Sequence, residues 1–187
     1  MERLLLHTCC APCSVYCVDS LRAEGIEPVS FWFNPNIHPY QEYKARRDTL
    51  LAYAADIGLE LAVRENYGLR EFVREVAADI DGRCAHCYTC RLEETARYAA
   101  QNGFTHFSTT LLVSPYQDHG GICRTAEELA ARYGVSFLYR DFRIGFRQGQ
   151  SKARELGLYM QKYCGCVFSE EERYSKQIRR DRERFGA

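Results

Sequence analysis

The sequence lacks a long apolar run. Near its N-terminus only residues 4–6, three leucines, are consecutively apolar before His7 and Thr8 interrupt them. This run is too short for the core of a signal peptide or for a membrane span. We therefore expect a cytoplasmic protein with no membrane partner.

The sequence also lacks an excess of charge of either sign, since 25 basic and 25 acidic residues give a formal net charge of zero. Any contact with nucleic acid must then come from local basic patches. The sequence contains no internal repeat, low-complexity tract or long linker. We expect one domain over residues 1–187, with an α/β core over about 1–140 and a helical extension over about 141–187.

Apolar runs rich in β-branched residues alternate with longer stretches of helical period. This alternation predicts an α/β fold with a mainly parallel, Rossmann-like sheet that helices cover on both faces and that binds ligands at the carboxyl ends of its strands. The predicted strands are residues 4–8, 28–33, 59–63, 104–112 and 135–139. The predicted helices are residues 13–23, 40–57, 69–78, 86–100, 125–133, 151–163 and 170–185.

Cysteine is abundant, with ten residues in the chain. In a reducing compartment, such a number favours metal binding or redox chemistry over disulfides. Cys9, Cys10 and Cys13 directly follow the first predicted strand, and Pro12 suits the first turn of the next helix. The N-terminus of that helix stabilises nearby thiolates, which is typical of metal ligands. The alternative is that these cysteines pack as small buried apolar residues.

A second group contains Cys84 and Cys87 in a CxxC step, with Cys90 at the same spacing. On a helix this spacing lets two or three thiolates reach one metal or cluster. A cysteine stripe packed into the core is the alternative, which the charged neighbours Arg83 and Arg91 disfavour.

A third group, Cys164 and Cys166, surrounds Gly165, which allows a sharp turn that directs both sulfurs to one site or divides them between two. The three groups together contain more thiols than one tetrahedral zinc ion takes. They are enough for a 4Fe-4S cluster beside a second metal or a redox thiol pair.

Six segments carry a resemblance to a known family: LLLHTCCAPCS, FWFNPNIHPYQEYKARR, RCAHCY, RLEETA, STTLLVSPYQDH and YMQKYCGCVFS. In this order, over residues 4–169, they resemble the QueH epoxyqueuosine reductases. The resemblance implies an oxidoreductase that needs an iron-sulfur centre but no cobalamin. Its reaction would convert epoxyqueuosine at the wobble position of tRNA to queuosine, the last step of that modification.

The resemblance also implies the ligands. It assigns metal binding to Cys9, Cys10, Cys13, Cys84, Cys87, Cys164 and Cys166. All of these except Cys13 are candidates to hold the 4Fe-4S cluster, and the second metal ion would be iron, or zinc in its place. The remaining cysteines, Cys17, Cys90 and Cys123, lie outside the motifs and are expected to be structural.

The predicted sheet resembles that of the ATP-pyrophosphatase, or HUP-like, proteins. Their glycine-rich phosphate loop would fall where CCAPCS stands, at residues 9–14. Without glycines the backbone there cannot approach a phosphate closely, so we do not expect ATP use.

Reduction of an epoxide to an alkene requires two electrons and two protons. An unidentified electron donor would supply the electrons. The segment 114–119 follows a predicted strand and contains Tyr116, Asp118 and His119, which are candidate proton donors.

Basic side chains that could hold tRNA phosphates occur in two helices: Lys44, Arg46 and Arg47, and then Arg179 and Arg180. Acidic residues are interleaved with the second group, so an ordinary solvated helix is the alternative there.

Two other functions fit the same residues. One is a zinc-binding RNA module without redox activity. The other is an iron-sulfur tRNA sulfur transferase, against which the absence of a phosphate loop argues.

Overall fold

Strands and helices alternate along the chain, and a computed structural model describes residues 3–186. The strands are β1 (Leu4–His7), β2 (Pro28–Trp32), β3 (Leu61–Val63), β4 (His106–Thr109) and β5 (Ser136–Phe137). The helices are α1 (Ala11–Ala23), α2 (Tyr40–Asp56), α3 (Leu69–Val76), α4 (Arg83–Gln101), α5 (His119–Tyr133), α6 (Phe146–Glu155) and α7 (Val167–Phe185). Two short 3₁₀ helices, η1 (Thr110–Val113) and η2 (Phe142–Gly145), follow β4 and precede α6.

The strands form one sheet in the order β3-β2-β1-β4-β5. Leu4 of the central strand β1 pairs with Pro28 of β2 on one side and with His106 of β4 on the other. All pairings among the described strands are parallel. The predicted α/β fold with a mainly parallel, Rossmann-like sheet is therefore confirmed.

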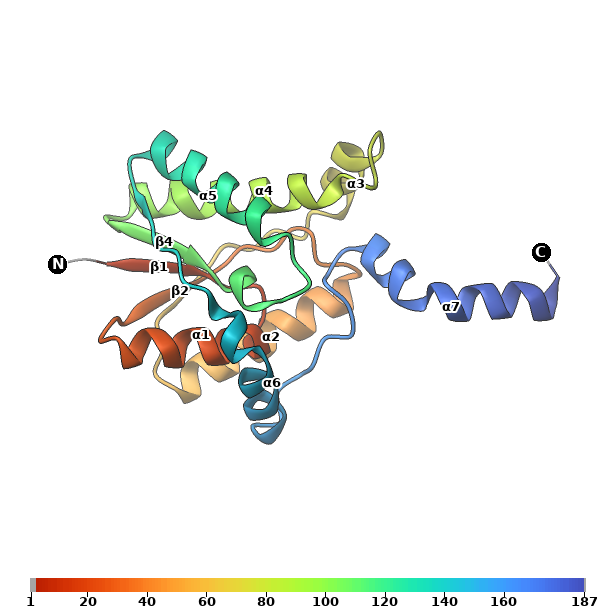
Figure 1. Cartoon of the computed structure of the whole chain (residues 1–187), viewed down its shortest axis with the longest axis horizontal. Coiled ribbons are helices and arrows are strands. Elements are labelled where there is room, and N and C mark those ends of the chain that lie inside the picture. The colour runs from red at the N-terminus through yellow and green to blue at the C-terminus, as the bar shows by residue number, and fades with distance from the viewer. Residues whose placement is uncertain (1–2, 187) are drawn as a thin grey trace.

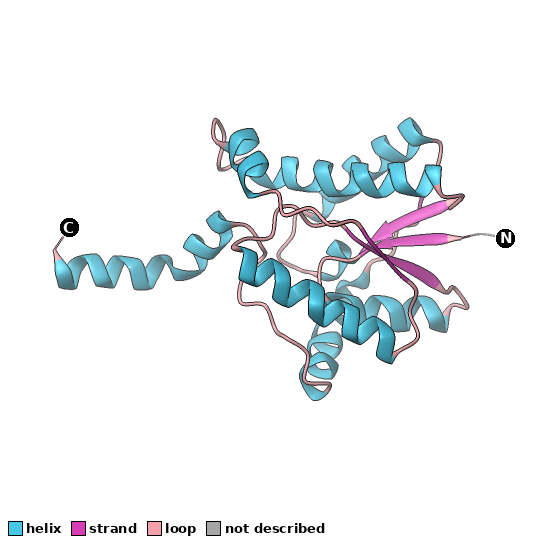
Figure 2. Cartoon of the chain, turned by 180° about the vertical axis from the view of Figure 1, so that it is seen from behind, coloured by secondary structure: helices cyan, strands magenta, loops and turns pink. Residues whose placement is uncertain are grey.

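Helices cover both faces of this sheet. Figure 1 shows α1, α2 and α6 on one side and α3, α4 and α5 on the other, and Figure 2 shows the same layers from behind. Between them, Leu5, Leu6, Val18, Leu92 and Phe107 are completely buried. Burial of each such side chain contributes about 1.5–3 kcal/mol to stability. The core therefore fixes β1, which carries the first cysteines.

The order of the strands creates a crevice at the carboxyl end of β1. The chain passes from β1 to β2 on one side of the sheet and later enters β4 on the other side, so the following segments diverge. A hydrogen bond joins these segments, because the backbone N–H of Cys9 donates to Oγ1 of Thr110 at 3.1 Å. Open parallel sheets bind their ligands at such a position.

Two predicted boundaries shift because side chains cap the backbone. The predicted strand 104–112 ends at Thr109, whose hydroxyl accepts the N–H of Leu111 at 3.1 Å and starts η1. Helix α5 begins at His119, six residues before the predicted start at 125. Its first turn contains glycines that disfavour helix, and the Asp118 side chain compensates by accepting the N–H of Gly121 at 3.0 Å.

The predicted helix 151–163 is confirmed only over residues 151–155 and is wrong beyond them. Helix α6 ends at Glu155, and Gly157 adopts a left-handed φ of 68° that terminates it. Tertiary contacts instead hold the following segment as a loop up to Cys166. A helical periodicity in the sequence cannot report such contacts.

Helix α7 stands away from the body of the protein and has no buried residue (Figure 1). Among the described residues, no helix is both long and apolar enough to cross a membrane.

Candidate functional site

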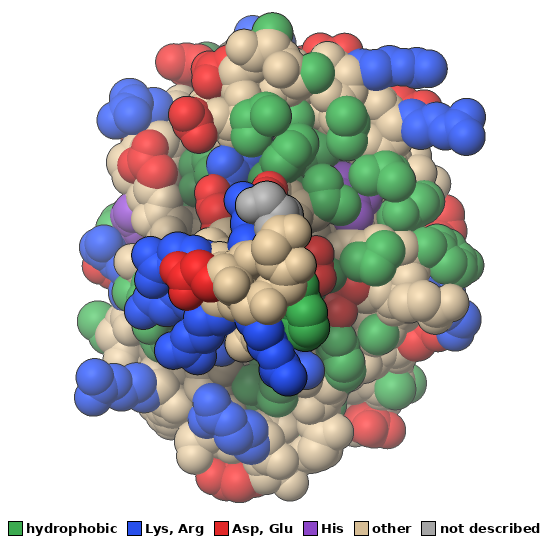
Figure 3. Space-filling model, turned by 90° about the vertical axis from the view of Figure 1, so that its right-hand side faces the viewer, with side chains coloured by type: hydrophobic (Ala, Val, Ile, Leu, Met, Phe, Trp, Pro, Cys, Tyr) green, Lys and Arg blue, Asp and Glu red, His purple; other side chains and the backbone are tan. Residues whose placement is uncertain are grey.

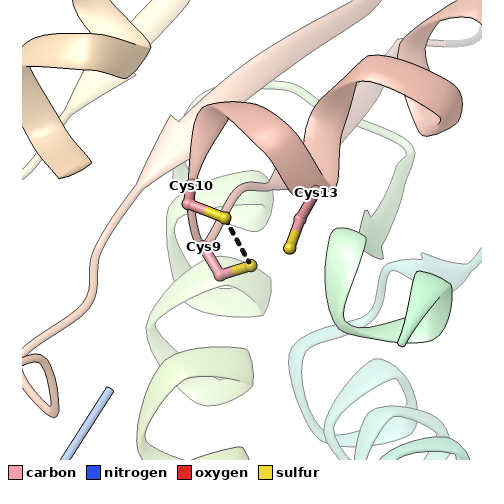
Figure 4. A group of neighbouring side chains, drawn as sticks. All are labelled: Cys9, Cys10 and Cys13. Atoms are coloured by element: carbon pink, nitrogen blue, oxygen red, sulfur yellow. Dashed lines mark hydrogen bonds between the residues drawn. The ribbon is translucent and has the colours of Figure 1, made fainter. Parts of the chain in front are cut away.

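The turn between β1 and α1 brings three thiols together. The sulfur atoms of Cys9, Cys10 and Cys13 all lie within 4.8 Å of one another, and those of Cys9 and Cys10 are 3.8 Å apart. Figure 4 shows the three sulfurs pointing toward a common centre. Cys10 precedes α1 with an extended backbone and Pro12 occupies its first turn, which places Cys13 one turn into the helix. This buried group could bind a metal.

The three thiols have different pKa values because they share hydrogen bonds. Bonds from Cys10 and Cys13 lower the pKa of Cys9 well below its usual value. Burial raises the pKa of Cys10, and hydrogen bonds to its two neighbours raise that of Cys13. Cys9 is thus the most acidic thiol of the group, because hydrogen bonds from the other two stabilise its thiolate form.

Two polar side chains from other elements approach these sulfurs. Thr110, the first residue of η1, donates its hydroxyl to Cys9 Sγ at 3.4 Å. Gln161 donates its amide Nε2 to Cys10 Sγ at 3.1 Å and to Cys13 Sγ at 3.4 Å. The loop after α6 therefore lies directly against the first cysteine group.

The second and third cysteine groups meet each other. Helix α4 begins at Arg83, earlier than the predicted 86, so that Cys84 and Cys87 both lie on it. Cys87 packs with Cys166 in one small buried cluster, whereas Cys84 and Cys164 are exposed. Burial raises the pKa of Cys87 to about 12; Arg91 opposes this rise, and the neighbouring thiols Cys164, Cys166 and Cys84 add to it.

The Cys164–Cys166 loop is held by a buried arginine. Arg46 donates from Nη1 to the carbonyl of Cys164 at 2.7 Å and from Nη2 to that of Tyr163 at 2.9 Å. Its Nε donates to Glu42 at 2.7 Å, and only 2% of the Arg46 surface is exposed. Gly165 packs so closely that an added Cβ would lie 3.2 Å from Nδ2 of Asn36.

All three cysteine groups line one cavity of about 580 Å³. Its lining includes six of the seven predicted ligands, namely Cys9, Cys13, Cys84, Cys87, Cys164 and Cys166. The seventh, Cys10, lies within the compact first group. A cavity with this many soft sulfur donors fits iron-sulfur or other thiolate-bound metals.

Comparisons with known proteins agree with this site. The family profile described as epoxyqueuosine reductase QueH matches residues 4–172. This chain belongs to the QueH family. The epoxyqueuosine reductase QueH of Dehalococcoides mccartyi is 41% identical over 174 residues, which cover 93% of this chain and 96% of the relative. That of Thermotoga maritima is 35% identical and covers 98% of each chain. The family name describes an oxidoreductase.

A solved structure shares the fold of this QueH-family chain. It is a predicted subunit of tRNA methyltransferase from Methanocaldococcus jannaschii, with a TM-score of 0.52 over 81% of this chain and 76% of its own. At 16% sequence identity the likeness concerns the fold alone.

The three candidate proton donors do not lie together. Tyr116 and Asp118 line the cysteine cavity, and Tyr116 is 86% exposed at its rim. His119 instead lies against Tyr139 and is 3.9 Å from the carboxylate of Asp141, outside the cavity lining. The geometry therefore favours the first two as groups that reach a substrate.

The first group of predicted RNA ligands is engaged within the protein. Arg46 is buried, as described above, because its guanidinium holds the cysteine loop, so it is not positioned to contact phosphate. Lys44 forms an ion pair with Asp48, and Arg47 forms ion pairs with Asp48 and Glu65.

The second group of predicted RNA ligands lies exposed on the surface. Arg179 and Arg180 are exposed on α7. Among the described residues neither forms an ion pair.

Besides Thr110, sequence reasoning missed three polar side chains that touch the thiols. Gln161 is one, and Gln117 is another, since its Nε2 lies 3.2 Å from Cys164 Sγ. The third is Arg91, whose Nη2 donates to Cys87 Sγ at 3.1 Å. Only Arg91 had a sequence signal, its position four residues after Cys87 on one helix.

The three other cysteines lie outside the main cavity lining. Cys17 is buried in the core, Cys90 packs at its edge, and Cys123 lies on α5. Cys90 also lines a smaller pocket of about 170 Å³ behind Cys87.

Proposed function

We propose that this chain reduces the epoxide of epoxyqueuosine in tRNA to the alkene of queuosine, with an iron-sulfur centre and without cobalamin. The observation that carries the proposal is the convergence of three distant cysteine segments on one open cavity at the carboxyl end of β1. Membership of the QueH family supports the substrate.

The reaction breaks both carbon–oxygen bonds of the epoxide and leaves a carbon–carbon double bond. It consumes two electrons from an external reductant and two protons, and the oxygen leaves as water. The protein must therefore bind the epoxide, receive electrons and deliver protons. The cavity offers groups for each of these tasks.

We assign the 4Fe-4S cluster to Cys84, Cys87, Cys164 and Cys166, because a cluster takes four cysteine ligands, these four thiols line one cavity, and the other three raise the pKa of Cys87. A cluster supplies electrons one at a time. The compact group of Cys9, Cys10 and Cys13 would hold the second metal ion, iron or zinc, since its three sulfurs are close enough for a single ion.

We assign proton delivery to Asp118. Its Oδ1 caps α5, while no hydrogen bond to Oδ2 is found among the described residues. Tyr88 fixes the Asp118 backbone by accepting its N–H at 3.1 Å, and donates its own hydroxyl to Gln117 at 2.7 Å. The helix cap and the bond to Tyr88 thus hold Asp118 at the cavity wall without an ion pair among the described residues.

Aromatic side chains at the rim would receive the unpaired base. The rings of Tyr116 and Phe146 lie nearly perpendicular with centroids 5.9 Å apart, and both line the cavity. Single-stranded bases are commonly recognised by stacking on such exposed rings. Lys162, exposed at the same rim, suits an adjoining phosphate.

Helix α7 would contact phosphates farther away. Arg173, Lys176, Arg180 and Arg184 share one face of this helix at spacings of three and four residues. In Figure 3, which views the protein along this helix, basic side chains gather on one side of it. Arg179 points about 100° away from Arg180 around the helix.

The decisive experiment is anaerobic purification, iron and sulfide quantification with a visible spectrum, and then incubation with epoxyqueuosine-containing tRNA and a chemical reductant. We expect a brown protein with at least four irons that forms queuosine. C84S should lose cluster iron and activity. The matched control C123S, a cysteine outside the cavity, should keep both.

Other outcomes would identify the alternatives. A colourless zinc protein that stays inactive after anaerobic cluster reconstitution would indicate a zinc-binding RNA module. A brown protein that transfers sulfur to tRNA but forms no queuosine would indicate a sulfur transferase. Either result would reject the reductase.

A further inference from the structure

Arg91 is a buried cation that has no carboxylate partner among residues 3–186. It lies on α4 with 2% of its surface exposed, and its Nε donates to the carbonyl of Cys87 at 3.2 Å. No acidic side chain among the described residues forms an ion pair with it. The buried acid nearest to it on the same helix, Glu94, pairs instead with Arg64 and Arg97.

The groups that compensate this charge are sulfurs. Arg91 Nη2 donates to Cys87 Sγ at 3.1 Å. Burial lowers the pKa of Arg91, but Cys87, Cys164 and Cys9 more than offset this effect and raise it. These cysteines belong to all three motif groups, so the charge of one guanidinium acts on at least one thiol of each group.

An arginine in this position is costly unless negative charge lies beside it. Removing a cation from water is unfavourable, and a close anion is needed to offset this desolvation free energy. Neutral thiols are poor partners, whereas metal-bound thiolates carry negative charge and accept N–H hydrogen bonds. The positive charge of Arg91 is therefore better compensated in the metal-bound protein than in the metal-free protein.

We propose that Arg91 is the fixed counter-charge of the cysteine centre, which holds the Cys87 sulfur in place and stabilises the thiolates when metal binds. This positioning role rests on the metal binding proposed above. It predicts that Arg91 strengthens metal binding while contributing little to the stability of the metal-free fold. Its positive charge also raises the reduction potential of a bound cluster.

The variants R91Q and R91K test the role, with R97Q as the matched control. Arg97 lies on the same helix but pairs with Glu94 and does not line the cavity. Zinc ion is the probe, measured anaerobically by competition with a chromophoric chelator in the absence of tRNA and reductant. We expect R91Q to bind zinc about 10- to 100-fold more weakly, R91K to lose less, and R97Q to match the wild type.

Thermal unfolding with and without zinc separates this role from simple packing. The gain in Tm on zinc binding should shrink in R91Q, while its metal-free Tm stays near that of the wild type. An equal loss of Tm in both states, or equal zinc affinities of R91Q and R97Q, would overturn the proposal. If R91Q does not fold, R91M replaces it, because methionine also removes the charge, and wild-type zinc affinity in R91M would overturn the proposal equally.

Reconstituted protein gives an independent readout. Spectroelectrochemical titration should find a lower reduction potential in R91Q than in the wild type and R97Q, and equal potentials would reject the electrostatic role. A wild-type chain that binds zinc but never assembles a cluster would contradict the proposed reductase function. The zinc comparison among the variants would still decide the role of Arg91.

Discussion

Replacement of Arg46 by methionine should destabilise the protein far more than the same change at its neighbour Arg47. Arg46 and Glu42 form a buried ion pair at 2.7 Å, with 2% and 10% of their side chains exposed. Methionine keeps much of the buried volume but leaves the Glu42 carboxylate without its cation. It also frees the carbonyls of Tyr163 and Cys164 from their hydrogen bonds.

The size of the effect follows from burial. Breaking one side of a buried ion pair costs about 3–5 kcal/mol, and a hydrogen bond to a charged group contributes about 1.5–3 kcal/mol. These contributions overlap because they share one guanidinium. We therefore expect a loss of about 4 kcal/mol, a large part of the 5–15 kcal/mol typical of a domain.

Urea denaturation at 25 °C measures this loss, with R47M as the control. Arg47 pairs with the more exposed Asp48 and Glu65, so R47M should cost only about 1 kcal/mol or less. The double variant E42Q/R46M should recover part of the loss because no buried charge is then stranded. Should R46M unfold completely, R46K, which keeps the charge but not the forked contact, provides the measurable comparison. If R46M and R47M differ by less than about 1 kcal/mol, the loop-holding role of Arg46 is refuted.

Three further predictions concern catalysis, pH and RNA. D118N should lower turnover about 100-fold while leaving the cluster spectrum and the helix cap intact, since asparagine caps helices as well as aspartate; unchanged turnover would remove Asp118 from the mechanism. Burial lowers the pKa of His38 from 6.5 to about 4, so the unfolded chain binds more protons than the folded chain between these pH values. The free energy of unfolding should therefore fall as the pH drops, by about 2 kcal/mol between pH 7 and pH 5. Urea midpoints at pH 7 and pH 5 should therefore fall less in H38Q, and an equal fall would contradict this origin. R180E should weaken tRNA binding and reduce the salt dependence of binding by about one phosphate contact. Both effects should be smaller in R179E, and equal effects in the two variants would argue against the proposed basic face.

The sequence predicted the parts of the fold that depend on local patterns. The run of leucines in β1 is buried because a central parallel strand is covered on both faces, and its apolar pattern reports that directly. The cysteine spacing at 9–13 and at 84–87 likewise indicates which thiols lie close together, because this proximity depends only on local geometry at a helix N-terminus. The α/β class and the clustering of thiols after β1 could therefore be anticipated.

The errors occurred where side chains from distant segments determine the backbone. The predicted helix 151–163 fails because Gln161 and Tyr163 bond to Cys10 and His38, residues more than a hundred positions away. The basic pattern around Arg46 suggested a surface that holds tRNA phosphates, yet the Cys164–Cys166 loop covers that arginine. Periodicity along one helix contains no information about what packs on it.

The sequence by itself determined which chemistry is present: ten cysteines, the motif order of a known family, and a sheet that ends in thiols. Only the tertiary structure decided how these parts combine. It brought Cys9, Cys87 and Cys164 to one cavity and placed the unpaired charge of Arg91 among them. The physical reason is that sulfur–sulfur distances and the compensation of a buried charge depend on packing between α4, the β1–α1 turn and the C-terminal loop, and no local pattern of residues encodes that packing.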